Sequence, residues 1–229
     1  MTRPDLKTPL ILVNLKTYKE TLGEASLSFA RSAREVSNQT GICIAVAPQT
    51  VDLRAIASTV GIPVLAQHID PIGYGKYTGH TLPEAVRDAG AVGTLLNHSE
   101  RHLDINTTKA CVKRAWETKL KPVVCVDTVE LGKTVAAYEP YAIAIEPPEL
   151  IGSGISVSKA RSEVISSAVE AVKKVNAKVR VLCGAGITSG NDVSAALKLG
   201  AEGILVASGV VQAKNQLEAL LDLASAAKT

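Results

Sequence analysis

The sequence predicts a single α/β domain, residues 1–229, in which eight strand–helix units close into a (β/α)8 barrel. Its short apolar runs are rich in Val, Ile and Ala and do not alternate with polar residues. Parallel strands that are covered on both faces have this composition. Amphipathic segments separate the runs, and no linker or change of composition marks a domain boundary. The runs cover residues 10–13, 42–47, 62–66, 91–96, 122–126, 141–145, 179–182 and 203–207.

The placement of polar residues and glycines favours a closed barrel over an open, doubly wound sheet, which the same units could also build. They come directly after the strands. In a barrel all these strand ends meet on one rim, where active sites lie, whereas in an open sheet they would spread along an edge. The residues are Asn14, Lys16, Gln67, His68, His98, Glu146, Gly184, Gly186, Ser208 and Gly209.

Helix signals lie between the runs. The patterns Thr21-x-x-Glu24 and Thr81-x-x-Glu84 have the form of a capping box, which predicts a helix start at each. Later helices are predicted over residues 158–176, 190–199 and 214–226. One helical face is expected to carry Leu27, Ala30, Ala33 and Val36, and helices are expected to end at Gly61, Gly90 and Gly200.

Composition narrows the function classes. The net charge of +3 is too small to indicate nucleic-acid binding and mildly favours an anionic small substrate. The four cysteines form no C-x-x-C pair, which indicates a reducing compartment. The N-terminus lacks a signal peptide, and no apolar run reaches the length that spans a membrane. We therefore expect a cytoplasmic protein that associates with neither membrane nor nucleic acid.

Glu146 is the leading candidate for a catalytic base. It ends the apolar run 141–145, and two prolines and then Gly-Ser-Gly follow it. The carboxylate lies at the end of a rigid strand, and the loop after it begins with rigid prolines and continues with flexible glycines. This arrangement is typical of a catalytic base beneath a mobile lid. The alternative is an exposed glutamate that opens a surface loop.

Two further side chains are candidates for the same rim. Asn14 and Lys16 point to the same side by strand alternation, and a rim lysine can neutralise developing negative charge. His98 is expected at a helix start, whose positive end favours a neutral imidazole. A solvated lysine and a merely hydrogen-bonded histidine are the alternatives. A metal site at His98-x-Glu100-x-His102 is disfavoured because no other rim position supplies a matching ligand.

Two glycine-containing loops are predicted to bind phosphate. Cys183-Gly-Ala-Gly186 follows the seventh run, and Ala207-Ser-Gly209 follows the eighth and precedes a short helical turn. Backbone N–H groups in such loops can approach an anion, and barrels commonly bind phosphate after strands seven and eight. The spacing is one residue off the dinucleotide fingerprint, so a nucleotide fold is the weaker reading.

Taken together, Asn14-x-Lys16, Asn97-His-Ser-Glu-Arg101, Glu146-Pro-Pro-Glu-Leu-Ile-Gly-Ser-Gly154 and the two glycine loops resemble triosephosphate isomerase, in its short archaeal form. The match runs from Asn14 to Gly209 in order and spacing. It implies an isomerase that interconverts D-glyceraldehyde 3-phosphate and dihydroxyacetone phosphate through an enediolate, in glycolysis and gluconeogenesis. It also implies that no metal or organic cofactor is needed and that the protein is a homotetramer.

The resemblance implies a role for each matching residue. Glu146 would be the base, His98 the electrophile that polarises the carbonyl, and Lys16 the counter-charge of the enediolate, with Glu100 a supporting carboxylate near it. Asn14 would help orient the substrate. Substrate and phosphate contacts would come from Asn14, Leu15, Lys16, Ile151, Gly152, Gly184, Gly186, Ala207, Ser208 and Gly209.

Two departures from the family pattern concern the lid, residues 147–157. Pro148-Glu149 stand where the family carries V-W, and Cys183–Gly186 stand where it carries the latching Y-G-G-S. The sequence therefore does not identify the contacts that hold the lid closed. Thr78-Gly-His80 resembles the T-G-E tip that reaches into a neighbouring subunit, and residues 68–80 are expected to be buried between subunits.

Two other functions are compatible with parts of the pattern. A metal-dependent phosphosugar epimerase would need His or Asp ligands at several strand ends, but strand two ends in Ala47-Pro48 and strand seven in Cys183. A non-catalytic phosphosugar-binding barrel would keep the glycine loops. It would have no reason to keep Glu146, His98 and Lys16 together.

Overall fold

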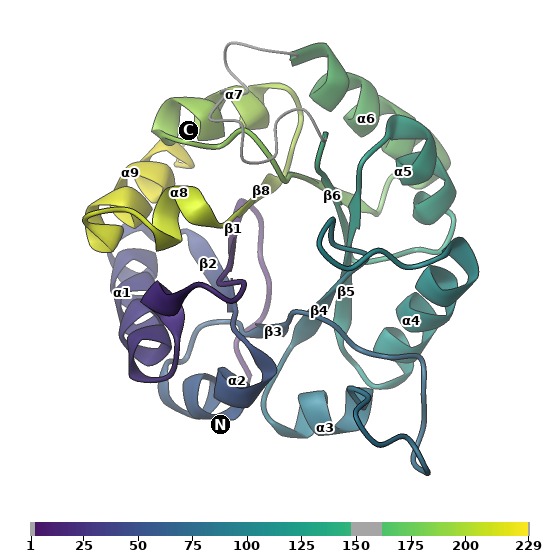
Figure 1. Ribbon diagram of the computed structural model, residues 1–229. Helices are drawn as coiled ribbons and strands as arrows, with labels where there is room; N and C mark the ends of the chain where they lie inside the picture. Colours follow the sequence, from purple (N-terminus) through teal and green to yellow (C-terminus); the bar gives the residue numbers. More distant parts are fainter. Residues whose placement is uncertain (1–2, 148–161, 229) are drawn as a thin grey trace.

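The computed structural model describes residues 3–147 and 162–228. Within these residues, eight parallel strands form one sheet in the order β2-β1-β8-β7-β6-β5-β4-β3, with helices around it (Figure 1). The two sheet ends meet where Val46 pairs with Val64, and the Val46 N–H donates to Pro63 O at 3.1 Å. The predicted (β/α)8 barrel is confirmed, with its seam between β2 and β3.

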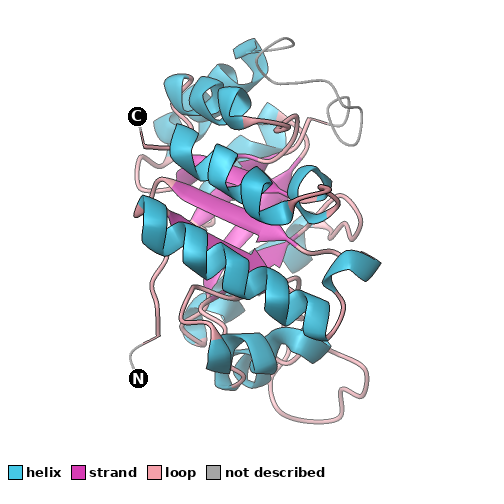
Figure 2. Ribbon diagram, turned by 90° about the vertical axis from the view of Figure 1, so that its left-hand side faces the viewer, coloured by secondary structure: helices cyan, strands magenta, loops and turns pink. Residues whose placement is uncertain are grey.

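The strands are β1 (Leu10–Asn14), β2 (Cys43–Ala47), β3 (Leu65–Ala66), β4 (Gly93–Leu96), β5 (Lys121–Val126), β6 (Ala142–Ile145), β7 (Arg180–Cys183) and β8 (Gly203–Val206). The helices are the 3-10 turn η1 (Lys19–Thr21), α1 (Glu24–Thr40), α2 (Thr50–Thr59), α3 (Pro83–Asp88), α4 (Ile105–Glu117), α5 (Val129–Ala136), α6 (Ser162–Val175), α7 (Gly190–Lys198), α8 (Ser208–Val211) and α9 (Gln216–Ala226). Figure 2 shows the helices lying outside the strands. No helix of the described chain has both the length and the apolar character to cross a membrane.

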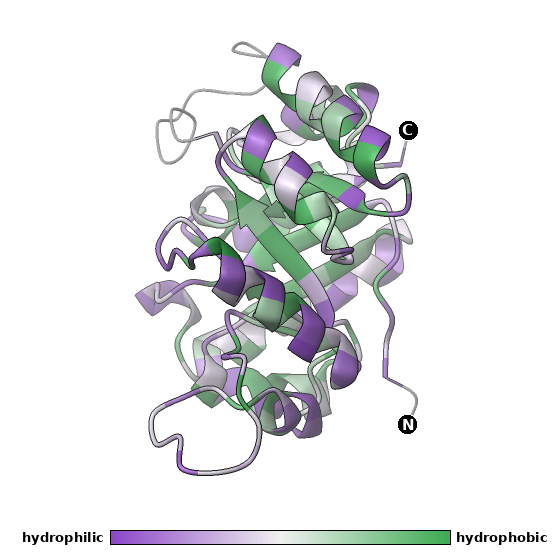
Figure 3. Ribbon diagram, turned by 90° about the vertical axis from the view of Figure 1, so that its right-hand side faces the viewer, coloured by the Kyte–Doolittle hydropathy of each residue, from purple (hydrophilic) through white to green (hydrophobic). Residues whose placement is uncertain are grey.

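Strand alternation divides the core into two layers. Successive side chains of a strand point to opposite faces, so one set fills the barrel and the other packs under the helices. Leu10 and Leu12 belong to the inner cluster, while Ile11 and Val13 belong to the outer one. Because both layers are apolar, the strands read as continuous hydrophobic runs, and Figure 3 shows this apolar interior beneath polar helix surfaces.

Several local predictions are wrong in detail. The two capping boxes do not form: Thr21 lies in η1, and α1 and α3 begin after Gly23 and Leu82, neither with a side-chain cap. The third strand shrinks to two residues because Pro63 cannot donate a ladder hydrogen bond and the chain only bridges to β2 there. The expected ends after α2, α3 and α7 are confirmed, with positive φ at Gly61, Gly90 and Gly200.

The segment between β3 and α3 projects from the barrel as an arm (Figure 1). Asp70 closes its base: its backbone N–H donates to Thr81 O at 3.0 Å, and its carboxylate accepts from the Thr81 N–H at 2.6 Å. His68 and Ile69 are buried within the chain itself, whereas residues 73–80 are exposed. The part available for burial between subunits is therefore shorter than the expected segment, residues 68–80.

Candidate active site

Strand alternation carries polar residues into the C-terminal mouth of the barrel. Leu10 and Leu12 face inward, so Asn14 does too; Ala142 and Ala144 face inward, so Glu146 does too. Both polar side chains are nearly buried. The mouth is therefore lined by the residues that continue the inner layer of the core.

Gln67 ties the end of β1 to the start of the β3–α3 arm. Its amide nitrogen donates to Lys16 O at 2.9 Å, Ala47 O at 3.1 Å and Asn14 Oδ1 at 3.3 Å. The Lys16 N–H donates to Asn14 Oδ1 at 3.0 Å, and Lys16 takes a positive φ of 48°. This network fixes a backbone conformation that is uncommon for a non-glycine residue and directs the Lys16 side chain.

The Lys16 ammonium lies over the mouth beside Glu100. Its Nζ is 2.7 Å from Glu100 Oε1, and the Lys16 side chain is 16% exposed against 59% for Glu100. The cation is therefore held by a solvent-exposed partner. This contact confirms the prediction that Glu100 lies near Lys16.

Asn97 sets the turn that aims His98 into the mouth. Asn97 has a positive φ of 55°; its amide nitrogen donates to Cys125 O at 2.9 Å, and its oxygen accepts from the Leu103 N–H at 2.8 Å. The Glu100 N–H donates to His98 Nδ1 at 3.2 Å. Nδ1 is thus the acceptor, which assigns the ring proton to Nε2. His98 presents an N–H donor to the barrel mouth.

The expected reason for a neutral His98 is wrong. No helix begins at His98; α4 begins at Ile105 and is capped by Asp104, whose carboxylate accepts from two backbone N–H groups. Burial lowers the pKa of His98, and the neighbouring Lys16 ammonium lowers it further. Desolvation and a nearby cation, rather than a helix dipole, keep this imidazole neutral.

Glu146 is a buried carboxylate with an unusual pKa. Burial raises its pKa to about 7, and the Lys16 charge opposes this, together with hydrogen bonds from the Cys125 thiol and the Ser99 N–H. Glu146 Oε1 lies 3.7 Å from His98 Nε2. A buried carboxylate and a neutral N–H donor therefore lie close together in the barrel mouth.

Gly184 makes room for this carboxylate. A Cβ at position 184 would lie 2.6 Å from Glu146 Cγ and 3.0 Å from Ile145 O. Real Cβ atoms do not approach so closely, so a side chain here would displace Glu146. The first glycine of the predicted phosphate loop thus also shapes the pocket of the base.

The two glycine loops lie against each other. A Cβ at Gly209 would lie 3.2 Å from Ile187 O, and Gly186 has a φ of 72°. Asp192 anchors the first loop: its Oδ2 accepts from the backbone and hydroxyl groups of Thr188 and Ser189, at 2.8 to 3.1 Å. The second loop runs into α8, so the expected helical turn after Gly209 is confirmed, with its start at Ser208.

The structure places one predicted substrate contact, Leu15, outside the mouth. The Leu15 side chain is buried in the outer core, its N–H donates to Ala47 O and its carbonyl accepts from Thr21, so no polar group of Leu15 is free. Ile151 and Gly152 lie outside the described residues, as does the lid except for Pro147. Ala207 and Ser208 are placed at the start of α8, as predicted.

The structure adds residues that sequence reasoning missed. The sequence gives no role to Gln67, and it does not single out Asn97, Ser99, Cys125 or Asp192 as supports of the site. Cys125 could have been found, because it shares the inner face of β5 with Val123 and therefore lies under the mouth. Within residues 3–147 and 162–228, no three His, Cys, Asp or Glu side chains group as a metal site would require.

Comparison with known proteins identifies the relatives of this chain. The family model described as triosephosphate isomerase matches residues 9–227. The chain is 53% identical to triosephosphate isomerase of Methanocaldococcus jannaschii, over 93% of this chain and 98% of that protein. It is 51% identical to that of Methanosarcina acetivorans, over 94% and 97% of the two chains. The crystal structure of triosephosphate isomerase from Bartonella henselae superposes with a TM-score of 0.73 at 21% identity, covering 98% of this chain and 99% of that one, which shows a shared fold.

Proposed function

The chain belongs to the triosephosphate isomerase family, and from that premise we propose that Glu146, His98 and Lys16 carry out its aldose–ketose isomerisation. The substrate pair is D-glyceraldehyde 3-phosphate and dihydroxyacetone phosphate, and the family places the reaction in glycolysis and gluconeogenesis. The chemistry moves one proton between adjacent carbons and passes through an enediolate.

Glu146 takes the proton from one carbon and returns it to the next. A general base works best when its pKa lies near the working pH. Burial raises the pKa of Glu146 to about 7, so near neutral pH the carboxylate is available and basic enough to accept a carbon-bound proton. The carboxylate is already desolvated before substrate arrives.

His98 donates from Nε2 to the carbonyl oxygen as that oxygen gains charge. Its Nδ1 is held by the Glu100 N–H, so the donor end is fixed. A neutral imidazole can give a proton to one oxygen and take a proton from the other. The Lys16 ammonium then balances the negative charge of the enediolate, while Asn14 fixes Lys16 and offers its amide to the substrate.

The phosphate is assigned to the two glycine loops. Gly184, Gly186, Ala207, Ser208 and Gly209 would offer backbone N–H groups, and the adjacency of the loops supports a single site. Asp192 would hold the first loop in shape. For Ile151 and Gly152 the proposal rests on the motif alone.

One observation carries the assignment: His98 Nε2 and Glu146 Oε1 lie 3.7 Å apart, with Lys16 close enough to influence the pKa of both groups. A non-catalytic phosphosugar-binding barrel is not favoured, because it has no need for this trio. The test is turnover of glyceraldehyde 3-phosphate by chelator-treated protein, with Glu146→Gln as the variant. We expect parental protein to isomerise without metal and Glu146→Gln to lose at least roughly 10²-fold in kcat. Near-parental turnover by the variant would assign the base to another residue.

We also propose a homotetramer in the cytoplasm. The exposed arm, with Tyr74 at 80% and Tyr77 at 46% exposure, supports burial of residues 73–80 in a subunit contact. The cysteines are free thiols in the described structure, in keeping with a reducing compartment. Light scattering at low concentration should report four subunits, and a fully active monomer would refute the assembly. Detection in the cytosolic fraction of lysed cells tests the location.

A further inference from the structure

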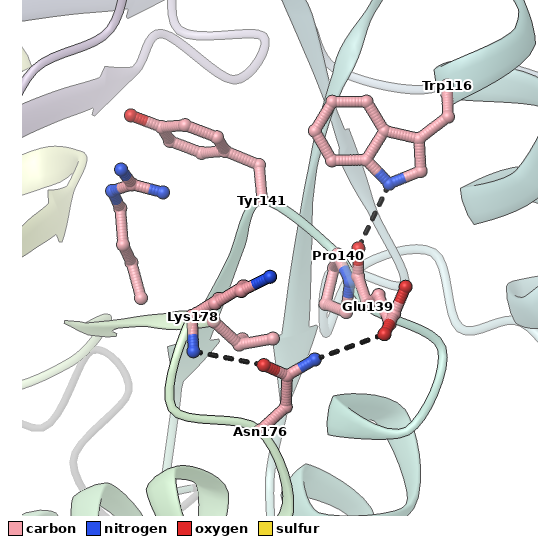
Figure 4. A pocket seen from close by; sticks show the side chains of 8 residues that line it. Trp116, Glu139, Pro140, Tyr141, Asn176 and Lys178 are labelled. Atoms are coloured by element: carbon pink, nitrogen blue, oxygen red, sulfur yellow. Dashed lines mark hydrogen bonds between the residues drawn. The ribbon is translucent and has the colours of Figure 1, made fainter.

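A cavity lies at the opposite end of the barrel from Glu146. Its volume is about 430 Å³, within the roughly 300–1,000 Å³ of small-molecule sites. The cavity lies where β6 and β7 begin, since Tyr141 precedes β6 and Arg180 opens β7. Figure 4 shows Trp116 and Tyr141 across the cavity from Asn176 and Lys178. The site is therefore separate from the catalytic mouth.

Two cations line the cavity, Lys178 and Arg180, and no described residue forms an ion pair with either. Neither the Arg180 guanidinium nor the Lys178 ammonium has an ion pair or side-chain hydrogen bond to any residue that the structure describes. The Arg180 guanidinium lies 4.3 Å from the centroid of the Tyr141 ring, which stacks it in place. An arginine oriented by a ring, with its N–H donors unused, is ready to bind an anion.

The Tyr141 ring is itself fixed. Its hydroxyl donates to Leu6 O at 3.0 Å, and the Lys121 ammonium lies 4.8 Å from the ring centroid. Asp5 pairs with Lys121, so that cation is neutralised while Arg180 is not. The positive charge of the cavity is therefore preorganised on a rigid wall.

The remaining wall is flat and apolar with one acidic edge. Trp116 is 42% exposed, and its indole N–H donates to Glu139 O at 3.0 Å, which leaves the ring surface as its open part. Pro140 completes the apolar wall. Asn176 donates weakly to Glu139 Oε1 at 3.5 Å and accepts from the Lys178 N–H at 2.9 Å. The Glu139 carboxylate would repel a second anionic group but can accept from an amino group.

We propose that this cavity binds a nucleoside monophosphate. The phosphate would pair with Arg180 and Lys178, the flat base would lie against the Trp116 and Pro140 wall, and an amino group on the base would donate to Glu139. A simple inorganic anion would use only the cations, and a neutral ring only the wall. Recognition therefore requires both parts in one molecule.

Trp116 is the one tryptophan of the chain, so its fluorescence reports this cavity directly. Iodide quenching of the full assembly first shows whether the indole is accessible; a shielded Trp116 would overturn the proposal. Titration with adenosine 5′-monophosphate should then change the emission saturably. Binding should be at least roughly tenfold tighter than for adenosine or inorganic phosphate alone. Saturating triose phosphate should leave the response unchanged.

Variants assign the response to the cavity. Lys178→Gln and Arg180→Gln should each weaken binding of the nucleotide by roughly tenfold, while Lys198→Gln, an exposed lysine on α7, should not. The exposed Lys178 side chain forms no hydrogen bond or ion pair with a described residue, so its variant remains informative if Arg180→Gln unfolds. Isomerase activity of each variant checks that the barrel is intact. Equal binding of inorganic phosphate and nucleotide, or an unchanged affinity in both variants, would refute the proposal.

Discussion

Glu146→Gln should gain stability relative to the parental chain as the pH rises. The gain is the variant's free energy of unfolding minus that of the parental chain, and it should be larger at alkaline than at acidic pH. The folded protein holds the proton of Glu146 more tightly than the unfolded chain, because burial raises its pKa from 4.5 to about 7. Below pH 4.5 both states are protonated and the carboxyl carries no penalty. As pH rises through 7 the buried carboxylate ionises, and the folded state alone bears the cost of desolvation.

The size of the effect follows from the pKa. The span from 4.5 to about 7, at about 1.4 kcal/mol per pH unit, corresponds to about 3 kcal/mol of unfolding free energy lost between acidic and alkaline pH. The amide of Gln cannot ionise. It also leaves a polar group buried, but that cost is the same at every pH. The variant-minus-parent difference in unfolding free energy should therefore rise by about 3 kcal/mol from pH 4.5 to pH 8.5.

Urea unfolding at a series of pH values and one protein concentration measures this difference, since an oligomer's stability depends on concentration. Glu35→Gln, an exposed glutamate on α1, is the matched control. Its difference from the parental chain should stay level across the same range. A flat difference for Glu146→Gln as well would mean that Glu146 is not a desolvated carboxylate, and the reasoning about its basicity would fail with it.

Three further substitutions test the support of the site. His98→Ala should lower kcat by roughly 10²–10⁴-fold with little change in KM, because the donor acts as the enediolate forms; a raised KM alone would make His98 a binding group. Gly184→Ala should cost about 1–3 kcal/mol of stability and lower kcat, because its Cβ would lie 2.6 Å from Glu146 Cγ; parental kcat would show that Glu146 moves freely. Asp192→Asn should raise KM by roughly tenfold and spare kcat, because a neutral amide holds the Thr188 and Ser189 donors less tightly and loosens the phosphate loop; an unchanged KM would contradict this role.

Much of the barrel could be predicted because parallel strands covered on both faces leave continuous apolar runs. β1 and β6 show this well, and their ends also give the direction of Asn14 and Glu146 by simple alternation. The length of β3 could not be predicted from its apolar run, because Pro63 and the seam with β2 limit the regular pairing to Leu65 and Ala66. Tertiary pairing, which no local pattern records, decided its length.

The geometry around His98 shows where sequence reasoning ends. The motif placed His98 near the base, and the structure brings the two together at 3.7 Å. The sequence predicts a helix start as the cause of its neutrality, but no helix begins at His98. The turn depends on Asn97 reaching Cys125 O across to the next strand, a contact between residues 28 apart in sequence. Long-range hydrogen bonds of this kind have no signature in a local pattern.

The inner core of the barrel determines the environment of Glu146, the proposed base. On the inner face of β6, Ala144 precedes Glu146 by two residues, and it pairs with Cys125 of β5 and Leu182 of β7; all three are buried. Filling the barrel with such residues stabilises the fold, and it also removes water from the carboxylate that alternation places just above them. The loss of water makes Glu146 basic, and it is the same loss that lowers stability above neutral pH. More polar side chains at positions 125, 144 and 182 would stabilise the ionised carboxylate and so make Glu146 a weaker base. Among variants at these positions, such as Leu182→Asn, stability at alkaline pH and the pKa of Glu146 should therefore change in opposite directions.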